Sequence, residues 1–194
     1  MFLGAHPDDN LIGCGGILSR IKKTGKTFHC YTFTCNSEER RREWLDAMDY
    51  ICPTSYKIFD FRGDSLPDHR YEVRRILEEV KNYEPDIVFT HSLRSIHQSH
   101  RALAEEAERI MRHITILGYA ETKSNPYFTP RVFIELTEEE MEEKLKLISF
   151  FKSQTSKFYL SPEAIRATAR VYGLQVNVEY ADAFDVCRIK VNKN

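Results

Sequence analysis

The segment Phe2-Leu3-Gly4-Ala5-His6-Pro7-Asp8-Asp9 organises this chain, together with Gly13-Cys14-Gly15-Gly16 a few residues later. The apolar residues before Ala5 predict the end of a short strand, and a helical apolar pattern follows the glycines. The histidine and the two aspartates would then lie at the carboxyl end of that strand, where open parallel sheets bind ligands. We expect the glycines to permit close backbone approach as the chain turns into the helix.

The polar part of this segment is compatible with two different roles. His6 and Asp9 offer the donor types that suit Zn²⁺, whereas Asp8 would point elsewhere and could act as a general base. Alternatively, Asp8, Asp9 or Asn10 simply caps the following helix. The segment taken alone supports both roles equally, so the choice depends on the rest of the chain.

Outward from this segment, strand patterns alternate with helix patterns. Strands are expected at 28–34, 56–61, 87–90, 131–136 and 179–189, and helices at 17–23, 38–50, 70–83, 102–112, 137–151 and 161–172. Asn36 with Glu39, and Thr137 with Glu140, predict capping boxes at two of the helices. The alternation predicts right-handed βαβ units and an α/β fold with a largely parallel sheet. Without a linker or repeat, residues 1–194 are expected to form one domain.

A second group of imidazoles follows the strand expected at 87–90. His91, His97 and His100 fall within ten residues, and the last two share one side of a first helical turn. This strand ends at the same sheet edge as the first, so the two groups can meet. His6, Asp9 and either His97 or His100 would make a three-ligand zinc site with an open fourth position, the pattern of catalytic zinc.

The chemistry of such a site is that of a metal-dependent amide hydrolase. Water on the metal ionises near neutral pH and becomes a nucleophile. Asp8 could take the water's proton, and the histidine that is not a ligand could donate to the oxyanion or to a leaving amine.

The composition of the chain indicates which binding partners and which cellular location to expect. The formal net charge is -1, which gives no electrostatic reason to expect nucleic acid or an anionic membrane. No apolar run has the length of a membrane span, and no signal peptide is visible. An odd number of cysteines without a CxxC pair predicts reduced thiols in a cytoplasmic protein; they are Cys14, Cys30, Cys35, Cys52 and Cys187. Cys14, between glycines, is expected to fill a tight turn.

Several segments resemble the LmbE-like / PIG-L family of zinc-dependent N-acetylglucosaminyl deacetylases. The resemblance covers nearly the whole chain and implies a Rossmann-like three-layer sandwich. The segments that carry it are Ala5-His6-Pro7-Asp8-Asp9, Gly13-Cys14-Gly15-Gly16, Pro85-Asp86-Ile87-Val88-Phe89-Thr90-His91, His97-Gln98-Ser99-His100, Ser153-Gln154 and Tyr180-Ala181-Asp182-Ala183-Phe184.

The resemblance also implies roles for individual residues. His6, Asp9 and His100 would hold Zn²⁺, or another divalent ion such as Fe²⁺. Asp8 would be the general base, and His97 would assist as an acid or oxyanion stabiliser. The substrate would be a small N-acetylated sugar or its conjugate, and the family makes a homo-oligomer, a trimer or hexamer, the expectation by analogy.

Three further positions bear on this resemblance. Arg40 matches a family arginine that would contact substrate hydroxyls or phosphate, although a solvated helix arginine fits the sequence equally well. Asn10 stands where many members carry Glu. Ser99 stands where the family usually has Asp, and a hydroxyl would orient a neighbouring histidine more weakly than a carboxylate.

The function expected from these observations is removal of an acetyl group from an N-acetylated amino sugar or its conjugate. Ser99 supports a rival, a catalytically weak homologue that binds metal or sugar. A second rival is a hydrolase of a non-sugar N-acyl amide, with the same metal chemistry. The loops 62–68 and 119–130 carry no readable code for the substrate.

Overall fold

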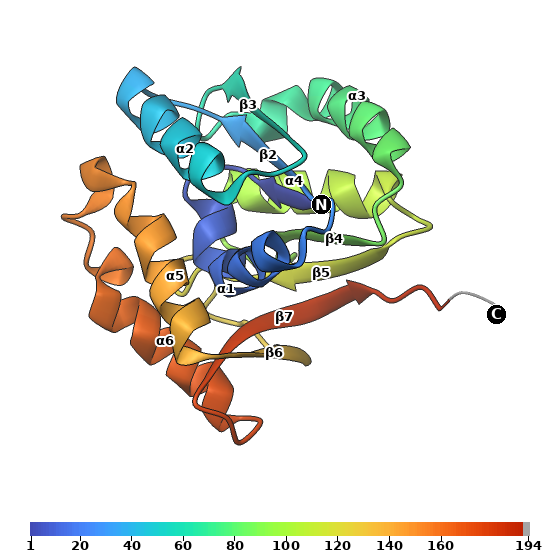
Figure 1. Cartoon of the computed structure of the whole chain (residues 1–194). Coiled ribbons are helices and arrows are strands. Elements are labelled where there is room, and N and C mark those ends of the chain that lie inside the picture. Colours follow the sequence, from blue (N-terminus) through green and yellow to red (C-terminus); the bar gives the residue numbers. More distant parts are fainter. Residues whose placement is uncertain (192–194) are drawn as a thin grey trace.

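A computed structural model of the chain describes residues 1–191, and its strands form one sheet in the order β3-β2-β1-β4-β5-β7-β6 (Figure 1). The strands β3, β2, β1, β4 and β5 pair in parallel, whereas β7 runs antiparallel to both β5 and β6. Their bounds are β1 Phe2–Gly4, β2 His29–Thr34, β3 Ser55–Phe61, β4 Ile87–His91, β5 Thr115–Tyr119, β6 Val132–Leu136 and β7 Tyr180–Arg188. The expected α/β fold with a mostly parallel sheet is confirmed.

Helices cover both faces of this sheet, which makes the molecule a three-layer sandwich. One apolar core packs residues of α1, α2, α5 and α6 against the sheet, and the other packs residues of α3 and α4 against the opposite face. The neighbours Phe2 and Leu3 belong to different cores, as the two-residue period of a strand requires. The helices are α1 Asp9–Thr24, α2 Glu38–Ile51, α3 Arg70–Val80, α4 Gln98–Ile110, α5 Glu138–Ser149 and α6 Pro162–Leu174.

One strand, β5, was not predicted from the sequence. It pairs along its whole length with β4 on one side and contacts β7 on the other. Its five residues include Gly118, which weakens the strand pattern. Because β5 was missed, the residues that follow it could not be placed at the sheet edge.

The glycine cluster lies inside α1, not in a turn before it, which corrects the expectation from the sequence. A Cβ on Gly13 would lie 2.3 Å from the Tyr119 ring, and one on Gly16 would lie 2.4 Å from the Leu136 side chain. These glycines therefore let the body of α1 pack closely onto β5 and β6. Cys14 is buried within the same helix and fills no turn.

One of the two predicted capping boxes is present. At α5 the Thr137 hydroxyl accepts from the Glu140 N–H, and the Glu140 carboxylate accepts from the Thr137 N–H. At α2 the N-cap is Ser37, whose hydroxyl accepts from the Arg40 N–H. Asn36 instead accepts from the Gly63 N–H at 2.7 Å, because its side chain faces the loop after β3.

A buried ion pair ties α5 to β7 and α1. The Lys144 ammonium lies 2.5 Å from the Asp182 carboxylate, and that carboxylate also accepts from the Ile17 N–H at 3.2 Å. Both side chains are almost fully buried, at 7% and 0% exposed. Asp182, which lies in one of the segments that carry the family resemblance, therefore serves the packing of the fold. None of the helices in residues 1–191 combines the length and the apolar character that a membrane span needs.

Candidate metal centre

The candidate site lies where β1 and β4 end side by side. The Ala5 N–H, just after β1, donates to the His91 Nε2 at the end of β4, over 3.0 Å. The first helix begins at Asp9 and α4 begins at Gln98, so both connections enter their helices beside this point. Two segments that are far apart in the sequence therefore meet at one edge of the sheet.

The structure brings His6, Asp9 and His100 together. His6 Nδ1 lies 3.2 Å from Asp9 Oδ2 and 3.1 Å from His100 Nε2, and the latter two atoms are 3.7 Å apart. Ligand atoms around a tetrahedral zinc, each about 2.0–2.1 Å from the metal, stand about 3.3 Å from one another. The three donors therefore fit a zinc-sized ion.

The far nitrogen of each histidine has a partner that leaves the near nitrogen free for a metal. His6 Nε2 lies 2.8 Å from the Gly63 carbonyl oxygen, which can only accept a proton. His100 Nδ1 lies 3.2 Å from the Ser95 hydroxyl, which in turn donates to the Ser124 carbonyl oxygen at 3.3 Å. Each neutral imidazole then turns a lone pair toward Asp9, as metal-binding histidines do.

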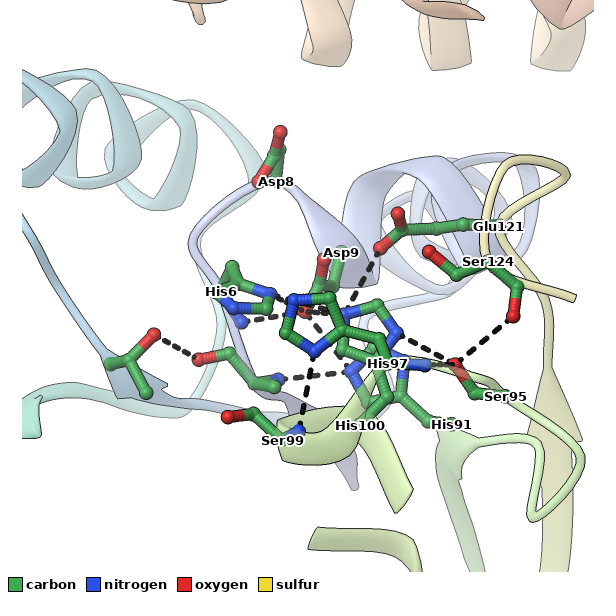
Figure 2. A network of polar contacts seen from close by, with 12 residues as sticks. His6, Asp8, Asp9, His91, Ser95, His97, Ser99, His100, Glu121 and Ser124 are labelled. Carbon is green, nitrogen blue, oxygen red and sulfur yellow. Dashed lines mark hydrogen bonds and ion pairs between the residues drawn. The ribbon is translucent and has the colours of Figure 1, made fainter. Parts of the chain in front are cut away.

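The charge of Asp9 is buried and surrounded by imidazoles (Figure 2). Its Oδ2 accepts from the His6 N–H at 2.5 Å and lies 3.0 Å from His91 Nε2. Burial opposes the ionised form, yet His6, His100 and His91 together hold the pKa of Asp9 well below its usual range. In the same contacts burial lowers the pKa of His6, but Asp9 outweighs it and raises that pKa. The carboxylate is thus available as an anionic donor.

Asp8 faces away from this cluster, as the sequence analysis expected for a base (Figure 2). It occupies the N-cap position of α1, but its side chain makes no capping hydrogen bond. Its Oδ1 instead accepts a hydrogen bond from the Arg40 guanidinium. The capping role considered for this aspartate is therefore not observed. Arg40 lines the same cavity, and its charge is engaged with Asp8.

His97 lies beside the cluster and presents one ring nitrogen to the cavity. It is the N-cap of α4, and its Nδ1 accepts from the Ser99 N–H at 3.2 Å. Burial, reinforced by the nearby His6, lowers the pKa of His97 to about 4. The ring is therefore neutral near pH 7, with its proton on Nε2, and can act as a hydrogen-bond donor.

Ser99 does not take the orienting role that a carboxylate could have there. Its hydroxyl is fully buried and has no hydrogen-bond partner among residues 1–191. Figure 2 shows this hydroxyl on the side away from the histidine rings. Ser95, four residues earlier, makes the contact to His100. Its place in a loop between β4 and α4 gave no signal in the sequence.

Glu121, which follows β5, is a further member of the site that was not predicted from the sequence. This carboxyl group is buried beside Asp9 and lies 3.8 Å from His100 Nε2. Burial, with the neighbouring Asp9 charge, raises the pKa of Glu121 well above its usual value. Asp9, His91, His100 and Glu121 form a second group of donors that are close enough to hold a metal ion. This group shares Asp9 and His100 with the set of His6, Asp9 and His100 described above.

A cavity of about 570 Å³ opens over these groups. Such a volume suits a small-molecule ligand. Its lining includes His6, Asp8, Asp9, His97 and His100, so every candidate ligand and acid–base group from the sequence faces one space. A bound metal, a base and a hydrogen-bond donor would together be equipped for hydrolysis of an amide.

Comparison with known proteins identifies the family. The family model described as GlcNAc-PI de-N-acetylase (PIG-L) matches residues 1–111. The uncharacterized deacetylase YaiS of Escherichia coli (strain K12) is 27% identical over 164 residues, which cover 78% of this chain and 89% of that protein.

Solved structures share the fold. The conserved protein TT1542 from Thermus thermophilus superposes with a TM-score of 0.81 at 21% identity, covering 100% of this chain and 95% of that one. The N,N'-diacetylchitobiose deacetylase from Pyrococcus horikoshii gives a TM-score of 0.75 at 20% identity, covering 95% and 82%. On the match of its family model over more than half of its length, this chain belongs to the PIG-L family, as its sequence motifs had indicated.

Proposed function

We propose that this protein is a zinc-dependent hydrolase that removes the acetyl group from an N-acetylated amino sugar or its conjugate, releasing acetate and a free amine. The observation that carries the proposal is the convergence of His6, Asp9 and His100 at ligand spacing, with Asp8 in the same cavity. Membership of a deacetylase family supports the reaction class.

The proposed metal ligands are His6, Asp9 and His100. When bound, a zinc ion at such a site supplies Lewis acidity and makes water a nucleophile near neutral pH. The ring nitrogen of each histidine that faces away from Asp9 forms a hydrogen bond with the protein: His6 with the Gly63 carbonyl oxygen, and His100 with the Ser95 hydroxyl. Because those contacts fix the tautomers, the unprotonated nitrogens face the ion without rearrangement.

The remaining side chains would move and hold protons. Asp8 would take a proton from the attacking water on a carboxylate oxygen, and it could pass that proton to the nitrogen of the leaving amine. Arg40 donates a hydrogen bond to Oδ1 of Asp8 and so holds the carboxylate in place, which leaves Oδ2 of Asp8 to accept the proton. His97 would donate its Nε2–H to the oxygen of the acetyl group as negative charge develops there.

An amino sugar is the proposed substrate because relatives carry that activity in their names. The family model names GlcNAc-PI, and one similar structure is a deacetylase of N,N'-diacetylchitobiose. The rival of a catalytically weak homologue rested on Ser99. That rival loses support because Ser95, not residue 99, contacts the metal-facing histidine.

The direct test is acetate release from N-acetylglucosamine and its glycosides, measured with metal-free and zinc-loaded protein. Asp8→Asn should lower acetate release about 10²–10⁴-fold, the usual contribution of a general base. Asp46→Asn is the matched control, since Asp46 is exposed on α2 and lies outside the cavity. Purified protein that binds no divalent metal, with an Asp8→Asn variant indistinguishable from the control, would overturn the proposal.

A further inference from the structure

Two lysines gather around one tyrosine on the lining of the cavity. Lys123 Nζ donates to the Tyr159 hydroxyl at 3.4 Å and lies 4.7 Å from the centre of that ring. Lys157 Nζ lies 5.9 Å from the same ring centre. All three side chains line the cavity that holds the candidate metal centre. A small ligand in this cavity can therefore reach both groups of residues.

These lysines differ from the arginines of the cavity because neither forms an ion pair with a carboxylate of residues 1–191. Arg40 pairs with Asp8, and Arg62 lies 3.9 Å from Asp64. Within residues 1–191, neither Lys123 nor Lys157 has a carboxylate oxygen within 4.0 Å of its ammonium group. Burial lowers the pKa of Lys157; the Asp8 charge opposes this effect, and the positive charges of Arg40 and Lys123 act in the same direction as burial. A ligand anion would relieve this repulsion.

The segment that carries Lys157 and Tyr159 is anchored to the fold. The Glu43 carboxylate of α2 accepts from both the N–H and the hydroxyl of Ser153, each at 2.6 Å. The Lys157 N–H donates to the Gln154 carbonyl oxygen at 3.0 Å. On either side, Phe151 and Leu160 are buried in the core. The ammonium group is thus presented by a fixed backbone.

Lys123 is also held in place, by a separate set of bonds. The Ser124 N–H donates to the Glu121 carbonyl oxygen at 2.9 Å, which closes a turn around Lys123. The Ser124 carbonyl oxygen accepts from the Ile96 N–H at 2.8 Å and so joins this turn to the loop before α4. Two independently anchored segments therefore bring cations to one wall of the cavity.

We propose that Lys123, Lys157 and the Tyr159 hydroxyl bind an anionic group, a phosphate or a carboxylate, on the substrate of this enzyme. The inference rests on the proposed function, since it places the acetamido group at the metal centre and the anion at the lysines of the same cavity. Two ammonium groups match the charge of a phosphate dianion, and the Tyr159 hydroxyl proton remains free to donate. The substrate is then an acidic conjugate of an N-acetylated amino sugar.

The experiment compares three substrates that share the N-acetylglucosamine unit and carry either a neutral or an anionic group at the anomeric position. They are the methyl glycoside of N-acetylglucosamine, its carboxymethyl glycoside and N-acetylglucosamine 1-phosphate. The zinc-loaded enzyme should show kcat/KM at least about tenfold higher for one of the anions than for the neutral glycoside, mainly through KM. The anion that gains more identifies the group. Equal kcat/KM for all three would overturn the anion site.

Substitutions then locate the preference. Lys123→Gln and Lys157→Gln should each lower the ratio of anionic to neutral kcat/KM about tenfold, and the double substitution should abolish it. Lys157→Arg should restore most of the ratio because it keeps the charge. Lys152→Gln is the matched control, because Lys152 is exposed in the same segment and does not line the cavity. An unchanged ratio in the double variant would overturn the assignment.

A binding measurement separates this inference from the proposed function. Glucosamine 1-phosphate and methyl glucosaminide, both already free amines, are titrated calorimetrically into wild-type protein and the double variant. Tighter binding of the phosphate, lost in the double variant, supports the anion site even if no acetate is released from any substrate. Acetate release without any preference in binding or kcat/KM would retain the proposed function and refute the anion site.

Discussion

Replacing Ser95 by alanine tests how the protein prepares a histidine for metal. The Ser95 hydroxyl lies 3.2 Å from His100 Nδ1 and donates to the Ser124 carbonyl oxygen. Ser95→Ala removes the acceptor that fixes the proton on Nδ1. The buried ring, only 1% exposed, could then carry its proton on Nε2, which would block the nitrogen that faces Asp9.

The magnitude follows from the contact that is lost. Removing an outer partner of a metal-binding histidine costs about 10–100-fold in metal affinity. This range corresponds to about 1.4–2.7 kcal/mol of binding free energy. The Ser95 hydroxyl also accepts from the His97 N–H at 3.2 Å, so the metal-free protein should lose about 1–3 kcal/mol of unfolding free energy as well.

The assay is competition for Zn²⁺ with a chromophoric chelator, together with thermal unfolding of the metal-free protein. Ser99→Ala provides a matched control. It also removes a buried serine hydroxyl, in the first turn of α4, but that hydroxyl has no hydrogen-bond partner among residues 1–191. It should bind zinc within about twofold of wild type. Wild-type zinc affinity in Ser95→Ala, or an equal loss of affinity in both serine variants, would contradict this role of Ser95.

Other expectations concern the fold and the thiols. Lys144→Met should cost about 3–5 kcal/mol in urea unfolding because it leaves a buried carboxylate unpaired, and a loss below about 1 kcal/mol would show that the pair is dispensable. Gly13→Ala should cost about 1–3 kcal/mol, because its Cβ would meet the Tyr119 ring at 2.3 Å, and an unchanged melting temperature would refute that packing. Burial raises the pKa of Cys30 to about 12, so a thiol reagent at pH 8 should modify exposed Cys52 first. Cys52→Ser should abolish that fast phase, and its persistence would place the reactive thiol elsewhere.

The part of the site that could be predicted from the sequence consists of polar residues that directly follow parallel strands. The aspartates after β1 and the histidines after β4 share a sheet edge, because both strands are parallel neighbours at its centre. The parallel direction of these strands follows from the alternation of strands and helices. Adjacent positions on a tight turn also diverge, which is why Asp8 and Asp9 face different ways. These relations depend on local pattern and can be read without a structure.

What could not be predicted depends on contacts between distant segments. Gly63 and Ser95 hold the two histidines, but one lies in a loop after β3 and the other in a loop after β4. Glu121 could not be placed at the site because the strand before it, β5, is short and contains a glycine, and so was not predicted. The glycines of α1 were assigned to a turn, since the residues that pack against them, such as Leu136, lie more than a hundred positions away.

The position of bound zinc in the crystal tests the central claim most directly. An anomalous difference map from crystals of the zinc-loaded protein should show one strong peak. We predict the peak at about 2.0–2.2 Å from His6 Nδ1, Asp9 and His100 Nε2. A peak instead among Asp9, His91, His100 and Glu121, the second group of buried donors, would contradict the assignment, and so would the absence of any peak in this cavity.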